Sequence, residues 1–219
     1  MDLEGQREQQ YLDKVMLQLT ERFGAARLPK KVKRQEAPFD AENNPTRGDI
    51  ENADGVADAP VRLNSGWYDL TEEDGGFTPV ASVKYLWVIR EDGNLILGVE
   101  DPSKAPEAFG IDLATLDQDA KGAIEGLGHP TLAAKFGKGG VLQPGGGRIG
   151  GELFAAAGGG WAINDHSGRY GGGRPDPKGL LAEAAKEFAR LGIPIAFIQS
   201  KATAENGGTD DQEVALVGQ

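Results

Sequence analysis

The chain has 219 residues, of which 39% are hydrophobic, 33 are glycine and 12 are proline, and its formal net charge is -11. This length suits one domain with flanking segments, and the acidic balance argues against nucleic acid and anionic membranes as partners. The absence of cysteine excludes disulfides and thiolate chemistry. No run approaches 18 consecutive apolar residues and the first residues lack a secretory apolar core, so we expect a cytoplasmic protein.

An amphipathic helix is predicted within residues 1–27. Its apolar positions recur at helical spacing: Tyr11, Leu12, Val15, Met16, Leu19 and Phe23. Gly24 provides a helix stop. We expect this stripe to pack on the core of the protein, in preference to binding an external partner, because most such stripes are buried.

Residues 28–60 are rich in Asp, Asn, Gly and Pro and predict a flexible linker. A short basic run at residues 30–34 is interpreted as a solvated segment rather than a targeting or nucleic-acid patch. The core domain is expected over residues 61–199, followed by a polar tail over residues 200–219, in which residues 214–217 can form an edge strand.

Within the core, WYDL at residues 67–70 predicts a strand or turn. Residues 80–100 alternate in the manner of a strand and surround the turn sequence EDGN, so they predict a β-hairpin. Both faces of the hairpin are largely apolar, which indicates a central place in a sheet. Residues 111–128 then have helical spacing, and a helix there delivers His129 at its C-terminal end, where the helix dipole favours a cation.

Residues 139–173 contain 14 glycines, with two short strands predicted at residues 148–154 and 161–164. A helix over residues 180–191, stopped by Gly192, leads to a strand at residues 193–198. The last two strands are expected to be parallel neighbours, because a helix connects them. The fold class is therefore α+β: a single mixed or antiparallel sheet with a central hairpin, two to three helices packed on it and a flexible N-terminal arm.

Polar side chains gather at and after the end of the strand at residues 161–164. Turns at strand ends commonly carry binding and catalytic groups, because a rigid scaffold presents them to a ligand. The candidate ligand-binding residues are His129, Asn164 and Asp165. The candidate catalytic residues, in the case of an enzyme, are Glu152, His166, Ser167, Arg169 and Tyr170.

Glu152 is the strongest single carboxylate of this group, because it lies in an otherwise apolar strand. A partly buried glutamate there can act as a base or stabilise developing positive charge. The structural alternative, which we favour, is that Glu152 pairs with Arg169 or Arg148 and joins two strands. Tyr170 is likewise more typical of a core than of a base-stacking platform.

Several chemistries are disfavoured by spacing. His166 and Ser167 are adjacent, which is awkward for a base and nucleophile pair, so a serine hydrolase is not expected. No Walker, HExxH or EF-hand pattern occurs and no dinucleotide fingerprint is well placed, so we predict neither a metal nor a cofactor.

The segments GRIGGEL, WAIND and HSGRY, followed by a helix ending in LGIPI, resemble a module of bacterial polymorphic toxin and effector-immunity systems. The hairpin KYLWVIREDGNLILG and the GHPTL segment belong to the same resemblance, which covers residues 84–198. It implies a role in such a system without assigning an activity.

Two functions of different classes follow. In the first, the chain is an acidic cytoplasmic binding protein that occludes a protein partner, with a basic toxin as the partner implied by its charge. In the second, it is a small effector-type enzyme that transfers or hydrolyses a nucleotide-linked group, in the manner of ADP-ribosyl transfer, through the polar cluster. We favour binding. The oligomeric state is left open.

Overall fold

The computed structural model describes residues 3–29, 67–69, 78–100, 114, 128–136, 142–143, 145–200 and 214–215. Nearly all of the predicted linker, the predicted helix over residues 111–128 except residues 114 and 128, and most of the polar tail lie outside these residues.

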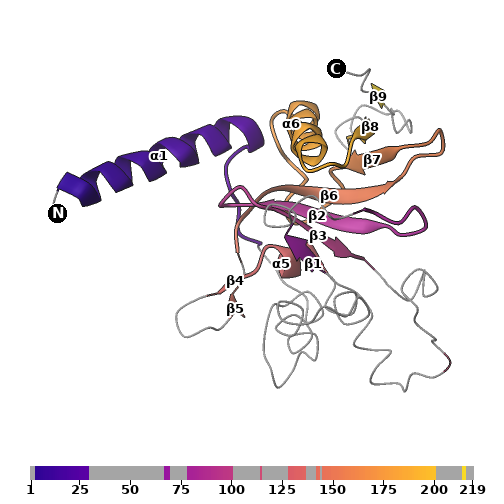
Figure 1. The fold of residues 1–219 in the computed structure, drawn as a ribbon, viewed down its shortest axis with the longest axis horizontal. Coiled ribbons are helices and arrows are strands. Elements are labelled where there is room, and N and C mark those ends of the chain that lie inside the picture. Colours follow the sequence, from indigo (N-terminus) through magenta and orange to yellow (C-terminus); the bar gives the residue numbers. More distant parts are fainter. Residues whose placement is uncertain are drawn as a thin grey trace.

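Seven of the described strands form one mixed sheet in the order β1-β3-β2-β6-β7-β8-β9 (Figure 1). Its strands are β1 Trp67–Asp69, β2 Tyr85–Arg90, β3 Leu95–Val99, β6 Gly147–Ala155, β7 Trp161–Asn164, β8 Ile195–Gln199 and β9 Val214–Ala215. The described helices are α1 Leu3–Phe23, α5 His129–Leu132 and α6 Pro177–Arg190. Two further short strands, β4 Lys135–Phe136 and β5 Leu142–Gln143, pair only with each other. The α+β class is thus confirmed, with an open mixed sheet.

The predicted hairpin is present and lies inside the sheet. β2 and β3 pair antiparallel, with Tyr85 opposite Val99 and Ile89 opposite Leu95. β2 also pairs with β6, and all five residues of β3 are buried. Two apolar faces require cover on both sides, and this explains why the hairpin is central rather than at an edge.

β7 and β8 form the one parallel pair among the described strands, and α6 connects them along the chain. α6 begins where Asp176 caps it, accepting the backbone N–H of Gly179, with Pro177 in the first turn. Both residue types are typical of a helix start, because proline lacks the N–H that would otherwise be unsatisfied there. The predicted edge strand is also present as β9, antiparallel to β8.

The sheet is covered on both faces. α6 packs on one face, where Phe188 meets the ring of Trp87 edge-on at a centroid distance of 5.6 Å. The opposite face buries Leu86, Val88, Ile96, Leu132, Ala133 and Tyr170. The second cluster places α5 and the turn after β7 on the face opposite α6.

The prediction that the stripe of α1 packs on the core is wrong for most of its length. Only the last turns contact the body, through the buried Phe23 and the half-buried Leu19. The outer part of α1 projects away from the sheet (Figure 1), and Tyr11 and Leu12 are 67% and 48% exposed. None of the described helices combines the length and apolar character needed to cross a lipid bilayer.

Candidate functional site

The glycines around β6 allow the turn after β7 to lie directly against the backbone. A β-carbon added to Gly151 would lie 1.6 Å from the carbonyl oxygen of Asn164. One added to Gly171 would lie 1.9 Å from the carbonyl oxygen of Asp165. Only glycine permits such approaches, so these two positions serve packing rather than the cradling of an anion.

Glu152 joins three neighbouring strands or strand ends. Its Oε1 lies 3.1 Å from Nζ of Lys84, which precedes β2, and its Oε2 accepts the side-chain amide of Asn164 at 2.8 Å. Asn164 returns the bond, because its Oδ1 accepts the backbone N–H of Glu152 at 2.9 Å. The structural interpretation of Glu152 is therefore supported by geometry, with Lys84 in place of the expected arginines.

The two arginines proposed as partners of Glu152 lie elsewhere. Arg148 is buried and donates to the Thr20 hydroxyl and the Gly24 carbonyl at the end of α1. Arg169 belongs to the turn after β7, and none of the ion pairs found for Glu152 within the described residues involves it. The expectation failed because the pairing of β2 with β6, which brings in Lys84, is a long-range contact that the sequence does not reveal.

The electrostatics of this cluster favour the ionised carboxylate. Burial acts to raise the pKa of Glu152, but hydrogen bonds from Asn164 and Lys84 and the charges of Lys84 and His166 outweigh it, so the pKa is lowered. Burial acts to lower the pKa of Lys84, while its bonds to Glu100 and Glu152 reverse the effect and raise it. Both groups are thus charged near neutral pH, and Glu152 is not suited to act as a general acid.

His166 lies at the open side of the same cluster. Its Nδ1 is 3.9 Å from Oε2 of Glu152, and its backbone N–H donates to Oδ1 of Asn164 at 3.0 Å. The side chain of Glu152 is 18% exposed and that of His166 29% exposed. Both residues belong to the predicted cluster and, together with Lys84 beside them, retain access to solvent.

The other predicted residues of the turn bind within the protein. The buried Ser167 accepts the backbone N–H groups of Arg169 and Tyr170 at 3.4 and 3.1 Å. The Tyr170 hydroxyl donates to the carbonyl of Gly145 at 3.2 Å. Asp165, also buried, accepts the Ser200 hydroxyl at 3.2 Å. These contacts fix the turn on the sheet and do not present a nucleophile.

His129 is the first residue of the four-residue helix α5. The helix predicted before it lies outside the described residues apart from residues 114 and 128, so the predicted effect of its C-terminal end on His129 stays a prediction. Its Nε2 lies 2.8 Å from the carbonyl of Gly151, and this nitrogen must carry the proton because a carbonyl only accepts. The contact anchors α5 to β6.

Glu152, Lys84 and His166 form what we call the polar corner. Among the described residues, it combines a carboxylate, an ammonium and an imidazole without a positioned nucleophile. Within the described ranges, no three His, Asp or Glu side chains form a group able to hold a metal ion. Lys84 was not among the predicted site residues, although a charged residue in the apolar hairpin segment is a signal of the same kind as Glu152 in its apolar strand.

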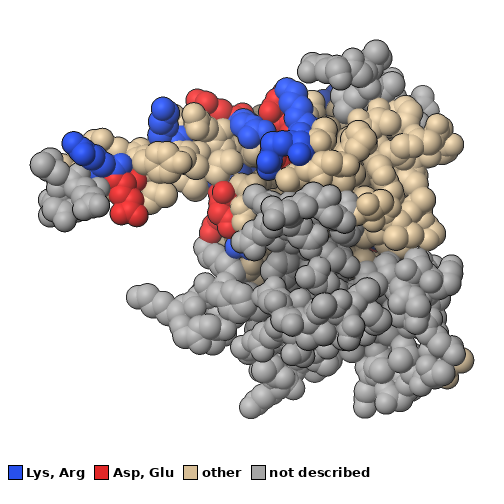
Figure 2. Space-filling model, viewed as in Figure 1, with Lys and Arg blue, Asp and Glu red and all other residues tan. Residues whose placement is uncertain are grey.

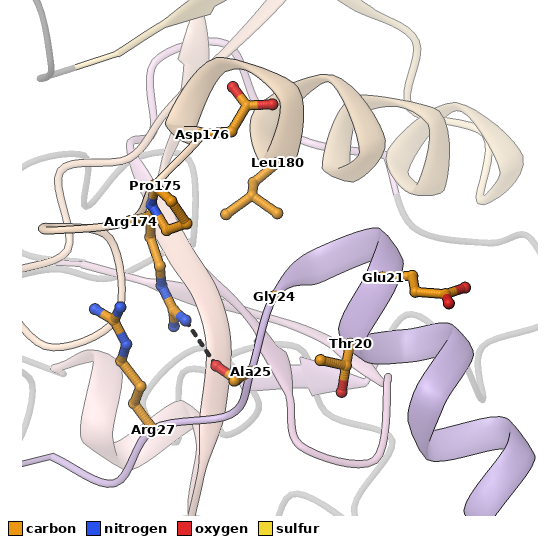
Figure 3. A pocket seen from close by; sticks show the side chains of 9 residues that line it. All are labelled: Thr20, Glu21, Gly24, Ala25, Arg27, Arg174, Pro175, Asp176 and Leu180. Atoms are coloured by element: carbon orange, nitrogen blue, oxygen red, sulfur yellow. Dashed lines mark hydrogen bonds between the residues drawn. The ribbon is translucent and has the colours of Figure 1, made fainter.

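A second polar feature was missed entirely. Thr20, Glu21, Gly24, Ala25, Arg27, Arg174, Pro175, Asp176 and Leu180 line a cavity of about 430 Å³ between the end of α1 and the start of α6 (Figure 3). Its two arginines are far apart in the chain and carry no common motif, so no local pattern identifies the cavity.

The fold and the site define an α+β protein built on an open mixed sheet, with a projecting helix and a polar corner. No family model, no curated protein and no solved structure matches the chain.

Proposed function

We propose that this protein is an acidic binding protein of a bacterial effector-immunity system, and that it occludes a protein partner with the outer part of α1. The observation that carries the proposal is the exposed apolar stripe of this projecting helix. Tyr11, Leu12 and Met16 are 67%, 48% and 43% exposed. An apolar helix face of this kind is typical of partners that dock into a groove, with tyrosine and aliphatic side chains as anchors.

Charge supports the same proposal in a different way. α1 carries side chains of both signs along its length (Figure 2), including Arg7, Glu8, Asp13 and Lys14. The whole chain has a net charge of -11. A basic partner is therefore attracted by the protein as a whole, while the apolar stripe supplies the specific contact.

The geometry of the polar corner favours binding over catalysis. Ser167 and Tyr170 use their hydroxyl groups within the protein, and Asn164 and Lys84 hold Glu152 as an ionised carboxylate. A transferase or hydrolase would need a group free to react at this corner. The enzyme alternative therefore depends on Glu152, His166 and Arg169.

The test compares one double variant and one single control variant with the wild type, in a bacterial assay that co-expresses the product of any toxin gene lying beside the gene for this chain. The double variant Tyr11→Ser/Leu12→Ser removes the stripe. The control is Leu17→Ser, because Leu17 is 60% exposed but lies on the opposite side of the helix. We expect the wild type and Leu17→Ser to protect the cells, and the double variant to lose protection with an unchanged melting temperature.

Two results would contradict this proposal. Growth arrest by this chain alone, relieved by Glu152→Ala or His166→Ala, would overturn the binding proposal in favour of the enzyme. Protection by the double variant equal to that by the wild type would show that α1 is not the contact. Binding rates measured at low and high salt then test the charge argument, since screening should slow association with a basic partner.

A further inference from the structure

The cavity at the junction of α1 and α6 contains two arginine side chains that approach each other. Arg27 follows α1 and Arg174 precedes α6, and their guanidinium groups lie side by side at one end of the cavity (Figure 3). Its volume of about 430 Å³ is in the range of about 300–1,000 Å³ that is usual for small-molecule sites. Leu180, Pro175 and Ala25 supply an apolar wall.

Both guanidinium groups are held in place by neutral acceptors. Arg174 is only 8% exposed and donates to the carbonyls of Tyr170, Ala25 and Gly147 at 3.1, 2.6 and 3.4 Å. Arg27 donates to the carbonyls of Gly172 and Gly173 at 3.1 and 3.0 Å. A guanidinium has five N–H groups. Arg174 uses three of them and Arg27 uses two in these hydrogen bonds, so both side chains keep donors for a ligand.

No carboxylate of the described residues compensates this charge. Arg22, Arg90 and Arg190 each form an ion pair with an acidic side chain, whereas Arg27 and Arg174 form none within the described part of the chain. This contrast is unexpected in a chain with a net charge of -11. The cavity is thus locally positive although the protein is acidic.

A third cation increases the repulsion. Arg148 donates to Thr20 and Gly24, which line the same cavity. Burial, and to a smaller extent the nearby charges of Arg27 and Arg148, together lower the pKa of Arg174 to about 10. Like charges held together at a buried site are unfavourable unless an anion offsets them.

The two acidic residues of the lining are turned away from the arginines. Figure 3 shows the carboxylates of Glu21 and Asp176 pointing away from the guanidinium pair. Asp176 is occupied as the cap of α6, where it accepts the N–H of Gly179 at 3.0 Å. The positive end of the cavity is therefore open to an anionic ligand.

We propose that this cavity binds the phosphate group of a small phosphate monoester, with Arg27 and Arg174 as its ligands and Leu180 beside its organic part. A phosphate monoester carries a charge of about -1.5 to -2 at neutral pH and so balances two guanidinium groups. A single carboxylate balances one. Guanidinium forks bind phosphate oxygens with paired, charge-assisted hydrogen bonds. This site is separate from the proposed partner contact on the outer part of α1.

Calorimetry and thermal melting with three probes test the proposal: inorganic phosphate, phenyl phosphate and acetate, each at the same ionic strength. We expect saturable binding of both phosphates and a rise in melting temperature, with phenyl phosphate binding more tightly because of the apolar wall. Acetate should have no effect beyond that of sodium chloride. Absence of saturable phosphate binding, or equal binding of acetate, would overturn the proposal.

The variant Arg27→Gln tests the assignment of residues. Arg27 is exposed, so the variant should fold, as circular dichroism can verify. Loss of a charge-assisted pair of bonds should weaken phosphate binding by about tenfold or more. The control Arg7→Gln removes the same charge from the exposed outer part of α1 and should bind phosphate as the wild type does. Equal weakening in both variants would indicate a general charge effect and refute the site.

Discussion

Substituting Gly171 by alanine should disrupt the packing of the turn after β7. The added β-carbon would lie 1.9 Å from the carbonyl oxygen of Asp165 and 3.0 Å from that of Gly150. A carbon and an oxygen in contact need about 3.3 Å, so two backbone segments must separate by roughly 1.4 Å. Both obstructing atoms belong to the backbone and cannot move aside as the end of a flexible side chain can. Overpacking usually lowers the free energy of unfolding by about 1–3 kcal/mol, and this substitution should reach or exceed the upper end of that range.

The neighbouring Gly172 offers a matched control. A β-carbon there meets no atom within 4 Å, and the residue is exposed. Gly172→Ala should therefore change the free energy of unfolding by no more than about 0.5 kcal/mol.

Urea unfolding followed by circular dichroism, together with thermal melting, measures both variants. For a chain of this size, a loss of about 3 kcal/mol lowers the melting temperature by roughly 6–12 °C. It is also a large share of the roughly 5–15 kcal/mol that stabilises most domains. If Gly171→Ala and Gly172→Ala unfold at the same urea concentration, the close approach is not a constraint, and the role given to these glycines is wrong.

Substitutions at three further residues probe other contacts. Glu152→Gln should cost about 1–2 kcal/mol at pH 7. The folded-state pKa of Glu152 is lowered, so the carboxylate contributes stability above its unfolded value and loses it as the pH falls through the folded value. The difference from wild type should therefore shrink at pH 3 in urea unfolding, and an equal difference at both pH values would contradict this reasoning. Arg148→Leu removes the hydrogen bonds to Thr20 and Gly24. Amide hydrogen exchange should become faster in α1, while the amides of β2 keep their protection. Equal acceleration in both elements would count against Arg148 as a local anchor of α1. Asp176→Ala should cost about 1 kcal/mol by removing the cap of α6, and Asp176→Asn should restore most of it in thermal melting.

Local patterns predicted most of the described fold. The alternation in residues 80–100 and the helical spacing before Gly192 each report which side of a local element is buried, and both elements are present. The parallel pairing of β7 with β8 follows from the helix between them. These inferences succeeded because each depends on residues close together in the chain.

The predictions that failed concern contacts between residues that are far apart in the chain. The partner of Glu152 is Lys84, which directly precedes β2, and β2 pairs with β6 in a register that a single sequence does not encode. The stripe of α1 has the same spacing whether it is buried or exposed, so the pattern alone favours the wrong outcome for Tyr11. The cavity joins Arg27 to Arg174 across most of the chain. Tertiary placement decides all three.

The two edges of the sheet restrict how another protein can attach to it. In the described residues, β1 at one edge has three residues and β9 at the other has two. Strand addition depends on a row of free main-chain groups, and within the described ranges these two strands provide few of them. A partner that binds the described part of the chain would accordingly be recognised through side chains more than through backbone, so single substitutions should be able to change its affinity.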